Sequence, residues 1–187
     1  MYLIFDTETT GVRSDARITQ LAFAAIDQNE DGTLTVNESY SSLIKPDGWE
    51  VPNERFFIEN NMSTERCEKE GVPVAEVVSR FLSHANKCKY LIAHNIDFDL
   101  RMISYELDRL SLSLPSPSEL QRICTMKAAT NHCAIPGRRG YKWPKLEQLH
   151  NKLFDRGFDG AHDALADVNA CGRCFFELKK LNIININ

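Results

Sequence analysis

Asp6 and Glu8 stand one residue apart at the end of the apolar stretch that opens the chain, MYLIFDTETTG. The run of Leu3, Ile4 and Phe5 before them predicts a fully buried strand. Residues i and i+2 of a strand point to the same face, so both carboxylates project together. Two acids so close repel each other, and paired oxygen ligands at a strand end suit a hard cation such as Mg²⁺ or Mn²⁺. We therefore expect a divalent-metal site at this strand end.

The rest of the pattern predicts an α/β domain. Apolar and β-branched residues predict three strands before any helix, the last two joined by a turn into an antiparallel hairpin. Amphipathic segments then alternate with two short strands. The expected strands are 1–8, 18–27, 33–46, 89–95 and 121–126, the expected helices are 63–71, 74–87, 98–110, 145–154 and 162–181, and a break is expected at 113–119. This order predicts a mixed sheet with helices over its faces.

Length and composition narrow the class of protein. The chain has 187 residues, which predicts a single domain over 1–187. It shows no run of apolar residues long enough for a membrane span and no signal-peptide pattern, so we expect a cytoplasmic protein without a membrane partner. A net charge of −4 does not exclude nucleic acid, because bound divalent cations would offset several carboxylates.

The six cysteines are expected to be reduced thiols, because a chain of this size does not need disulfides. Cys171 and Cys174 form one C-x-x-C pair without the further ligands of a zinc site. They are expected to be buried helix residues, with metal or redox chemistry as the alternative.

A second acidic stretch is LIAHNIDFDLRMI at 91–103. Here a buried strand runs into His94 and Asn95, and Asp97 and Asp99 open the next helix. Acids near a helix start also serve as ordinary caps that complement the helix dipole. This stretch alone does not decide which aspartate is functional.

A third acidic stretch is GAHDALADV at 160–168. Asp163 is a natural N-cap for the last helix, and Asp167 follows in the next turn among apolar residues. A carboxylate there is buried unless its helix face looks into a site. His162 is expected just outside the helix, free to turn toward whatever Asp167 faces.

Together the three stretches resemble the DEDDh class of 3′→5′ exonucleases, the DnaQ-like proofreading family with a ribonuclease H-like fold, which includes the epsilon-type exonuclease domain of DNA polymerase III. FDTETTG resembles its first motif. HNIDFD resembles the second, H-N-x-x-F-D, which selects Asp99 over Asp97, and HDALAD resembles the third, H-x-x-x-x-D. The three motifs occur in order between residue 1 and about residue 180, which makes the resemblance specific.

The resemblance implies a three-layer ribonuclease H-like fold and a hydrolytic site with two Mg²⁺ or Mn²⁺ ions. In such sites one ion activates a water and the other stabilises the leaving 3′ oxygen. Asp6 would bridge the ions, with Glu8 and Asp167 on the water side and Asp99 on the other. His162 would be the general base, a role that suits an imidazole. The product would be a nucleoside 5′-monophosphate.

The resemblance also implies a pocket for the terminal nucleotide. Its expected lining residues are Thr9, Thr10, Gly11, His94, Asn95 and Phe98, of which Phe98 could equally belong to the core. Residues 136–145, PGRRGYKWPK, form the one compact basic and aromatic cluster of the sequence. Such clusters are typical of single-strand binding, and the alternative is a solvated loop that Trp143 anchors to the core.

Other functions remain possible at this stage. Asp6-x-Glu8-x-Thr10 resembles the D-x-D-x-T of haloacid-dehalogenase-type phosphatases, but that assignment leaves HNIDFD and His162 without a role. A nucleic-acid-binding module without catalysis is a second alternative, although all the acids are present. Within the exonucleases we expect single-stranded DNA as substrate, in proofreading or repair. Ribonuclease T-like and oligoribonuclease-like enzymes share the same acids, and association with a polymerase or repair complex stays open.

Overall fold

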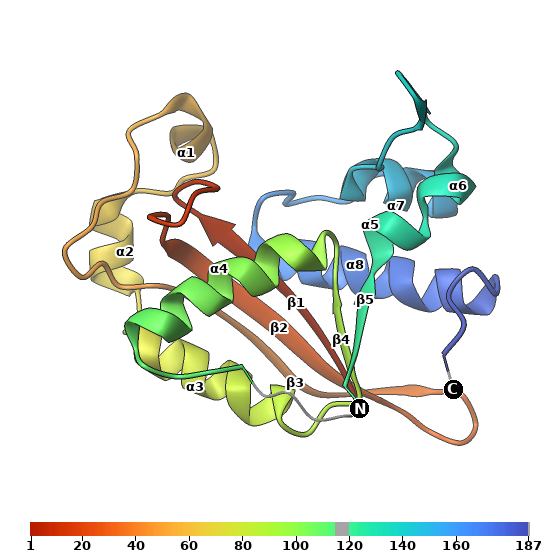
Figure 1. Cartoon of the computed structure of the whole chain (residues 1–187), viewed down its shortest axis with the longest axis horizontal. Coiled ribbons are helices and arrows are strands. Elements are labelled where there is room, and N and C mark those ends of the chain that lie inside the picture. Colours follow the sequence, from red (N-terminus) through yellow and green to blue (C-terminus); the bar gives the residue numbers. More distant parts are fainter. Residues whose placement is uncertain (115–119, 187) are drawn as a thin grey trace.

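The computed structural model describes residues 1–114 and 120–186, which form a five-stranded mixed sheet between two layers of helices (Figure 1). The central strand β1 (Tyr2–Thr9) pairs antiparallel with β2 (Ile18–Gln28), which pairs with β3 (Leu34–Leu43). On its other side β1 pairs parallel with β4 (Tyr90–Ala93), followed by β5 (Gln121–Cys124). The predicted α/β class with a mixed sheet is confirmed.

The five longer helices agree with the sequence pattern to within a few residues. Among the described residues the helices are α1 (Arg55–Glu59), α2 (Thr64–Glu70), α3 (Val74–Ala85), α4 (Ile96–Arg109), α5 (Thr125–Ala128), α6 (Thr130–Cys133), α7 (Leu146–Phe154) and α8 (Ala164–Lys180). The short helices α1, α5 and α6 were not predicted, because four or five residues are too few to show a period. A small hairpin, β6 (Pro136–Gly137) and β7 (Gly140–Tyr141), precedes α7. Within the described residues no helix is long and apolar enough to cross a membrane.

Other boundaries differ for local reasons. α4 begins two residues before its predicted start. Asn95 adopts a left-handed conformation that ends the turn after β4, so the helix starts directly at the next residue, Ile96. β5 stops at Cys124 and α5 follows at once, where a strand to 126 was expected. The predicted break at 113–119 lies outside the described residues from 115 on. Cys171 and Cys174 are buried in α8 as free thiols, as expected.

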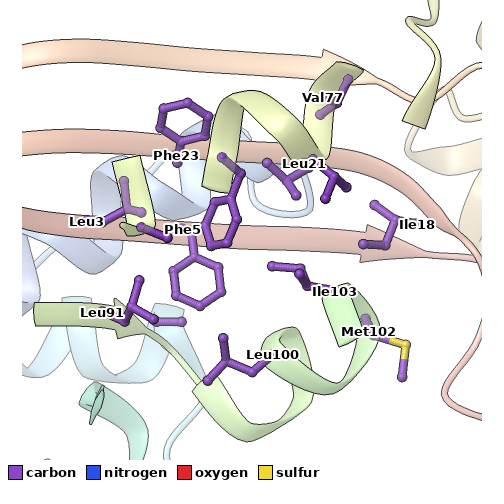
Figure 2. Close-up of a cluster of buried hydrophobic side chains, with 14 of the residues drawn as sticks. Leu3, Phe5, Ile18, Leu21, Phe23, Val77, Leu91, Leu100, Met102 and Ile103 are labelled. Carbon is purple, nitrogen blue, oxygen red and sulfur yellow. The ribbon is translucent and has the colours of Figure 1, made fainter. Parts of the chain in front are cut away.

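β1 is buried on both faces, and its side chains alternate between two cores. Leu3 and Phe5 face α3 and α4, in a cluster that Figure 2 shows with residues from β2, α3 and α4. Tyr2 and Ile4 face the opposite way, toward α8. Burial of side chains of this size stabilises a fold by roughly 1.5–3 kcal/mol each. The two cores therefore hold β1 rigidly, and with it the acids at its end.

The carboxyl ends of β1, β4 and β5 meet at one edge of the sheet because these strands are parallel. Ligands of open α/β sheets bind at such edges. At this edge Glu8 pairs with Gln20 and Thr9 with Ile18, so Thr19 is an extra residue of a β-bulge. The acids of β1 and the turn that follows β4 therefore come together.

Gly71, at the end of α2, lies where two backbone segments approach closely. A Cβ there would lie 2.3 Å from the carbonyl oxygen of Cys67 and 2.6 Å from the backbone nitrogen of Lys45. These backbone groups cannot rotate away as a side chain can, because the bridge between Ile44 and Val72 joins the same segments. Only glycine fits without moving the chain.

We expect Gly71→Ala to lower the free energy of unfolding by about 1–3 kcal/mol, the usual cost of overpacking. Urea denaturation followed by circular dichroism measures this. Gly157→Ala is the matched control, because no atom lies within 4 Å of the added Cβ. The free energy of unfolding of the control is expected to equal that of the wild type or to exceed it by up to about 1 kcal/mol. Equal stability of both variants would contradict the close approach at Gly71.

Candidate metal and catalytic site

The structure brings the four predicted acids together from three elements. Asp6 and Glu8 extend from the end of β1 on the face that carries α8. Asp99 lies in the first turn of α4, and Asp167 lies in the first turn of α8. The four carboxylates are close enough to raise one another's pKa.

The electrostatics of this group are those of an anion cluster that needs a counter-charge. Burial, and then repulsion from Asp99, Asp167 and Glu8, raises the pKa of Asp6 well above its ordinary value. Burial and neighbouring acids raise the pKa of Glu8 to about 8 and that of Asp167 to about 6. Burial also raises the pKa of Asp99 to about 7, although hydrogen bonds from Thr7 oppose it. With a pKa of about 8, Glu8 keeps its proton at neutral pH unless a cation replaces it.

Asp99 and Asp97 lie in different surroundings. The sequence of residues 91–103 alone did not decide which of the two is functional. Asp99 is 2% exposed, and its Oδ1 accepts hydrogen bonds from the Thr7 backbone N–H at 3.1 Å and hydroxyl at 2.8 Å. Asp97 is exposed and forms an ion pair with Lys127. Thr7, which the sequence analysis did not single out, therefore fixes Asp99 against β1.

Asp163 caps α8 as predicted. Its Oδ1 accepts hydrogen bonds from the backbone N–H groups of Leu165 and Ala166, both at 3.1 Å. Its Oδ2 accepts a hydrogen bond from Gln20 Nε2 at 3.0 Å, and the Gln20 Oε1 accepts one from the Ala164 N–H at 3.3 Å. The Gln20 side chain thus ties the first turn of α8 to β2, directly across the sheet from Glu8.

Gln20 was missed by the sequence analysis. The one signal for it is a polar residue inside the apolar strand ITQLAFAA. Its partners lie 143 and 144 residues away along the chain, beyond the reach of any local pattern.

His162 lies just outside α8, as expected, with its side chain exposed. Its backbone N–H donates to Asp167 Oδ2 at 3.3 Å. The imidazole meets the ring of Phe56 edge-on, with centroids 5.1 Å apart, so the unpredicted helix α1 contributes to the site. His162 and Asn95 have φ values of 71° and 82°, and strained backbone of this kind tends to cluster at functional sites.

The donor atoms present fit a divalent cation. Glu8, His162 and Asp167 each offer one ligand atom, and these atoms lie within 4.8 Å of one another. Carboxylate oxygens are the ligands that Mg²⁺ and Mn²⁺ prefer, and a bound cation would lower the pKa values that burial raises at Glu8 and Asp167. The ligand roles of Asp6, Glu8, Asp99 and Asp167, and the base role of His162, stay predictions.

The predicted pocket residues that follow β1 form a tightly held loop. The Thr9 hydroxyl donates to the Gly11 carbonyl at 2.7 Å, and the Thr10 hydroxyl accepts from the Arg17 N–H at 2.9 Å. Arg17 in turn forms a salt bridge of 2.9 Å with Glu106, which is 1% exposed. Thr10 and Gly11 line a cavity of about 360 Å³ beside this loop.

The predicted residues of the second motif separate into two groups. Both ring nitrogens of His94 are used internally: Nε2 donates to the Pro144 carbonyl and Nδ1 accepts from the Thr125 hydroxyl, each at 3.0 Å. Burial lowers the pKa of His94 to about 4, so the ring is neutral. His94 and Asn95 line a second cavity, whereas Phe98 packs against the hydrophobic core and is not among that cavity's lining residues.

The family model named RNase_T and described as Exonuclease matches residues 3–175. The chain is 32% identical over 183 residues to the 3′-5′ exonuclease DinG of Bacillus subtilis (strain 168), covering 95% of this chain and 17% of that protein. It is 24% identical to DinG of Staphylococcus haemolyticus (strain JCSC1435), covering 97% of this chain and 19% of that protein. The chain therefore spans less than a fifth of these relatives.

Solved structures of E. coli Exonuclease I share the fold. The complex with a dT13 oligonucleotide has a TM-score of 0.75 at 19% identity, over 97% of this chain and 42% of that chain. The zinc-bound form of the complex with single-stranded DNA has a TM-score of 0.75 at 21% identity, over 96% and 40%. The predicted ribonuclease H-like fold is confirmed.

The site predicts how stability depends on pH and metal. Carboxyls whose pKa is raised by folding stabilise the folded state while protonated, and this contribution is lost as pH rises through their folded values. In EDTA we expect the melting temperature to fall from about pH 5 to about pH 8, because in this range folded Glu8 and Asp99 hold protons that the unfolded chain has already lost. Mg²⁺ or Mn²⁺ should raise it most at the higher pH, where no protons compete.

Asp6→Asn removes one repelling charge, so comparison with the wild type separates the contribution of this site from that of all other titrating groups. In EDTA this variant should lose less stability than the wild type over the same pH range, and it should gain less from Mg²⁺. Asp97→Asn is the control and should behave like the wild type, because Asp97 is exposed and paired with Lys127. Scanning fluorimetry measures all three proteins, and a metal-independent melting temperature in the wild type would contradict the assignment.

Proposed function

The chain belongs to the RNase_T exonuclease family, DEDDh enzymes of ribonuclease H-like fold, and from this premise we propose that it removes nucleotides from the 3′ end of single-stranded DNA. The observation that carries the proposal is the convergence of the three acidic stretches on one edge of the sheet, with His162 beside them. The DinG relatives are named 3′-5′ exonucleases, and Exonuclease I in the solved complexes holds single-stranded DNA, which supports the direction and the substrate.

In this proposal two divalent cations, Mg²⁺ or Mn²⁺, are held by the predicted acids, which are Asp6, Glu8, Asp99 and Asp167. When bound, such ions supply the charge that activates water and stabilises a leaving oxygen. The protein contributes the fixed positions of the ligands. Thr7 holds Asp99, and the turn that Asp163 caps holds Asp167.

The remaining residues move a proton and hold the substrate. His162 would take the proton from a water whose oxygen attacks the last phosphorus. The bond from that phosphorus to the 3′ oxygen of the preceding nucleotide breaks, the 3′ oxygen takes up a proton from water, and a nucleoside 5′-monophosphate is released. The loop of Thr9, Thr10 and Gly11 would receive the terminal nucleotide, and the buried pair of Arg17 and Glu106 would keep this loop in place.

A degradation assay tests the proposal. A 5′-labelled single-stranded DNA and an RNA of the same sequence are incubated with the protein in Mg²⁺ or Mn²⁺, with EDTA as the metal-free control. We expect a ladder that shortens from the 3′ end of the DNA. His162→Ala should lower the rate by about 10²–10⁴-fold, the usual contribution of a general base.

Two aspartates of the second motif provide a matched pair for this assay. Asp99→Asn should lower the rate by at least about 100-fold, because even residues that only support metal ligands contribute 10–100-fold. Asp97→Asn, two residues away and exposed, should stay close to the wild-type rate. Faster degradation of the RNA would reassign the substrate. No degradation of either strand by a metal-bound protein would refute the enzyme and leave a nucleic-acid-binding module.

A further inference from the structure

A cavity of about 420 Å³ opens beside the candidate site, between the β4–α4 turn and α7. His162 and Asp167 form part of its lining, so it is continuous with the acids. Trp143, Met126 and Phe158 give it an apolar wall. Its size is within the ~300–1,000 Å³ range of pockets that bind small molecules. The mechanism proposed above uses His162 and Asp167 of this lining but not the apolar wall.

Trp143 is an exposed aromatic residue in the lining of this cavity. The indole is 60% exposed, which contradicts the alternative that Trp143 anchors its loop to the core. The residues beside it are held instead. Pro144 is buried and its carbonyl accepts from His94 at 3.0 Å, while the Lys142 N–H donates to the Ile135 carbonyl at 3.0 Å. An aromatic ring presented on a preorganised backbone loses little freedom when a ligand stacks on it.

The hairpin of β6 and β7 places positive charge next to Trp143. Pro136 pairs with Tyr141 and Gly137 with Gly140, which leaves two arginines at the turn. In Figure 1 this part of the chain, between α6 and α7, extends away from the body of the molecule. The exposed cations of the segment are Arg138, Arg139, Lys142 and Lys145. None of the four has an ion-pair partner among the described residues.

Charge is distributed unevenly over this surface. Glu147 and Asp167 lie on the cavity lining, together with Lys145, so the cavity itself is not cationic. The excess positive charge lies on the hairpin. This division suits a ligand with a flat apolar part for the cavity and a chain of anionic groups for the hairpin. A single strand of nucleic acid has both parts, because its bases are free to stack and its phosphates are evenly spaced.

We propose that Trp143 stacks on a nucleobase of single-stranded DNA beside the candidate site, and that the hairpin 136–141 binds phosphates of the same strand. The inference rests on the proposed function and adds to it the path of the strand outside the acids. Stacking on an aromatic ring tolerates every base, so this surface favours single strands without selecting sequence.

Tryptophan fluorescence tests the stacking directly. The chain has two tryptophans, so Trp49→Phe leaves Trp143 as the only indole. The titration uses this variant with Asp6→Asn added, in EDTA, where the proposed turnover cannot occur. A single-stranded dT oligonucleotide should quench the fluorescence to saturation, and the same strand in a blunt duplex should not. Absence of saturable quenching would overturn the stacking.

Affinity measurements on matched variants complete this test. In the Asp6→Asn background, Trp143→Ala should weaken binding about 10-fold, whereas Trp143→Phe, which keeps an aromatic face, should recover most of the affinity. Equal affinities for the alanine variant and its parent would overturn the role of Trp143. Circular dichroism establishes that each variant is folded.

The hairpin is tested by the salt dependence of binding. Each phosphate contact on a single strand adds about 0.7 to the slope of log K against log salt, so Arg138→Ala with Arg139→Ala should lower the slope by about 1.4. Lys69→Ala with Lys87→Ala removes the same charge from exposed positions outside this surface and should leave the slope unchanged. Equal slopes for the two double variants would overturn the hairpin's role.

The two proposals fail in different ways. Binding is measured without turnover, and degradation is measured with Mg²⁺ or Mn²⁺ and the native acids. If the Trp143 and hairpin substitutions leave binding unchanged in a protein that still degrades DNA, only the proposed path of the strand is refuted. If the substitutions weaken binding as expected but the protein degrades neither DNA nor RNA, only the proposed exonuclease activity is refuted.

Discussion

Repulsion among buried carboxylates is the constraint on which the rest of this structure depends. Asp6, Glu8, Asp99 and Asp167 would separate if they stood on a flexible chain, because charge repulsion within the group adds to burial in raising the pKa of Asp6, Glu8 and Asp99. Two hydrophobic cores hold them together, one on each face of β1. The folding free energy of the domain thus maintains a local arrangement that is unfavourable until cations neutralise it, which is the condition that a metal-dependent hydrolase requires.

Much of this arrangement could be predicted from the sequence because it follows from short periods. A strand alternates with period two, so Asp6 and Glu8 had to share a face, and Asp163 had to cap the helix that carries Asp167. The resemblance of three ordered motifs then selected Asp99 over Asp97. The structure supplies the physical reason for that choice, since only Asp99 is buried and bonded to Thr7.

The parts that could not be predicted are contacts between distant segments. Gln20 bonds to Asp163, 143 residues away, and Phe56 meets His162 from a helix of five residues. Neither contact leaves a period or a spacing in the sequence, because each depends on how α1 and α8 pack against the sheet. The exposure of Trp143 could not be predicted either, since composition alone cannot distinguish an exposed tryptophan from one that anchors a loop to the core.

The bond between Gln20 and the first turn of α8 has a consequence for the order in which the protein matures on the ribosome. Domains are synthesised from the N-terminus, so β1 and β2 emerge well before α8. Until α8 docks, one face of β1 lacks its cover, and the site lacks Asp167 and His162. The nascent chain therefore carries Asp6, Glu8 and Asp99 before the other two predicted site residues have been added. The full set of predicted site residues comes together only when the last helix docks on the sheet.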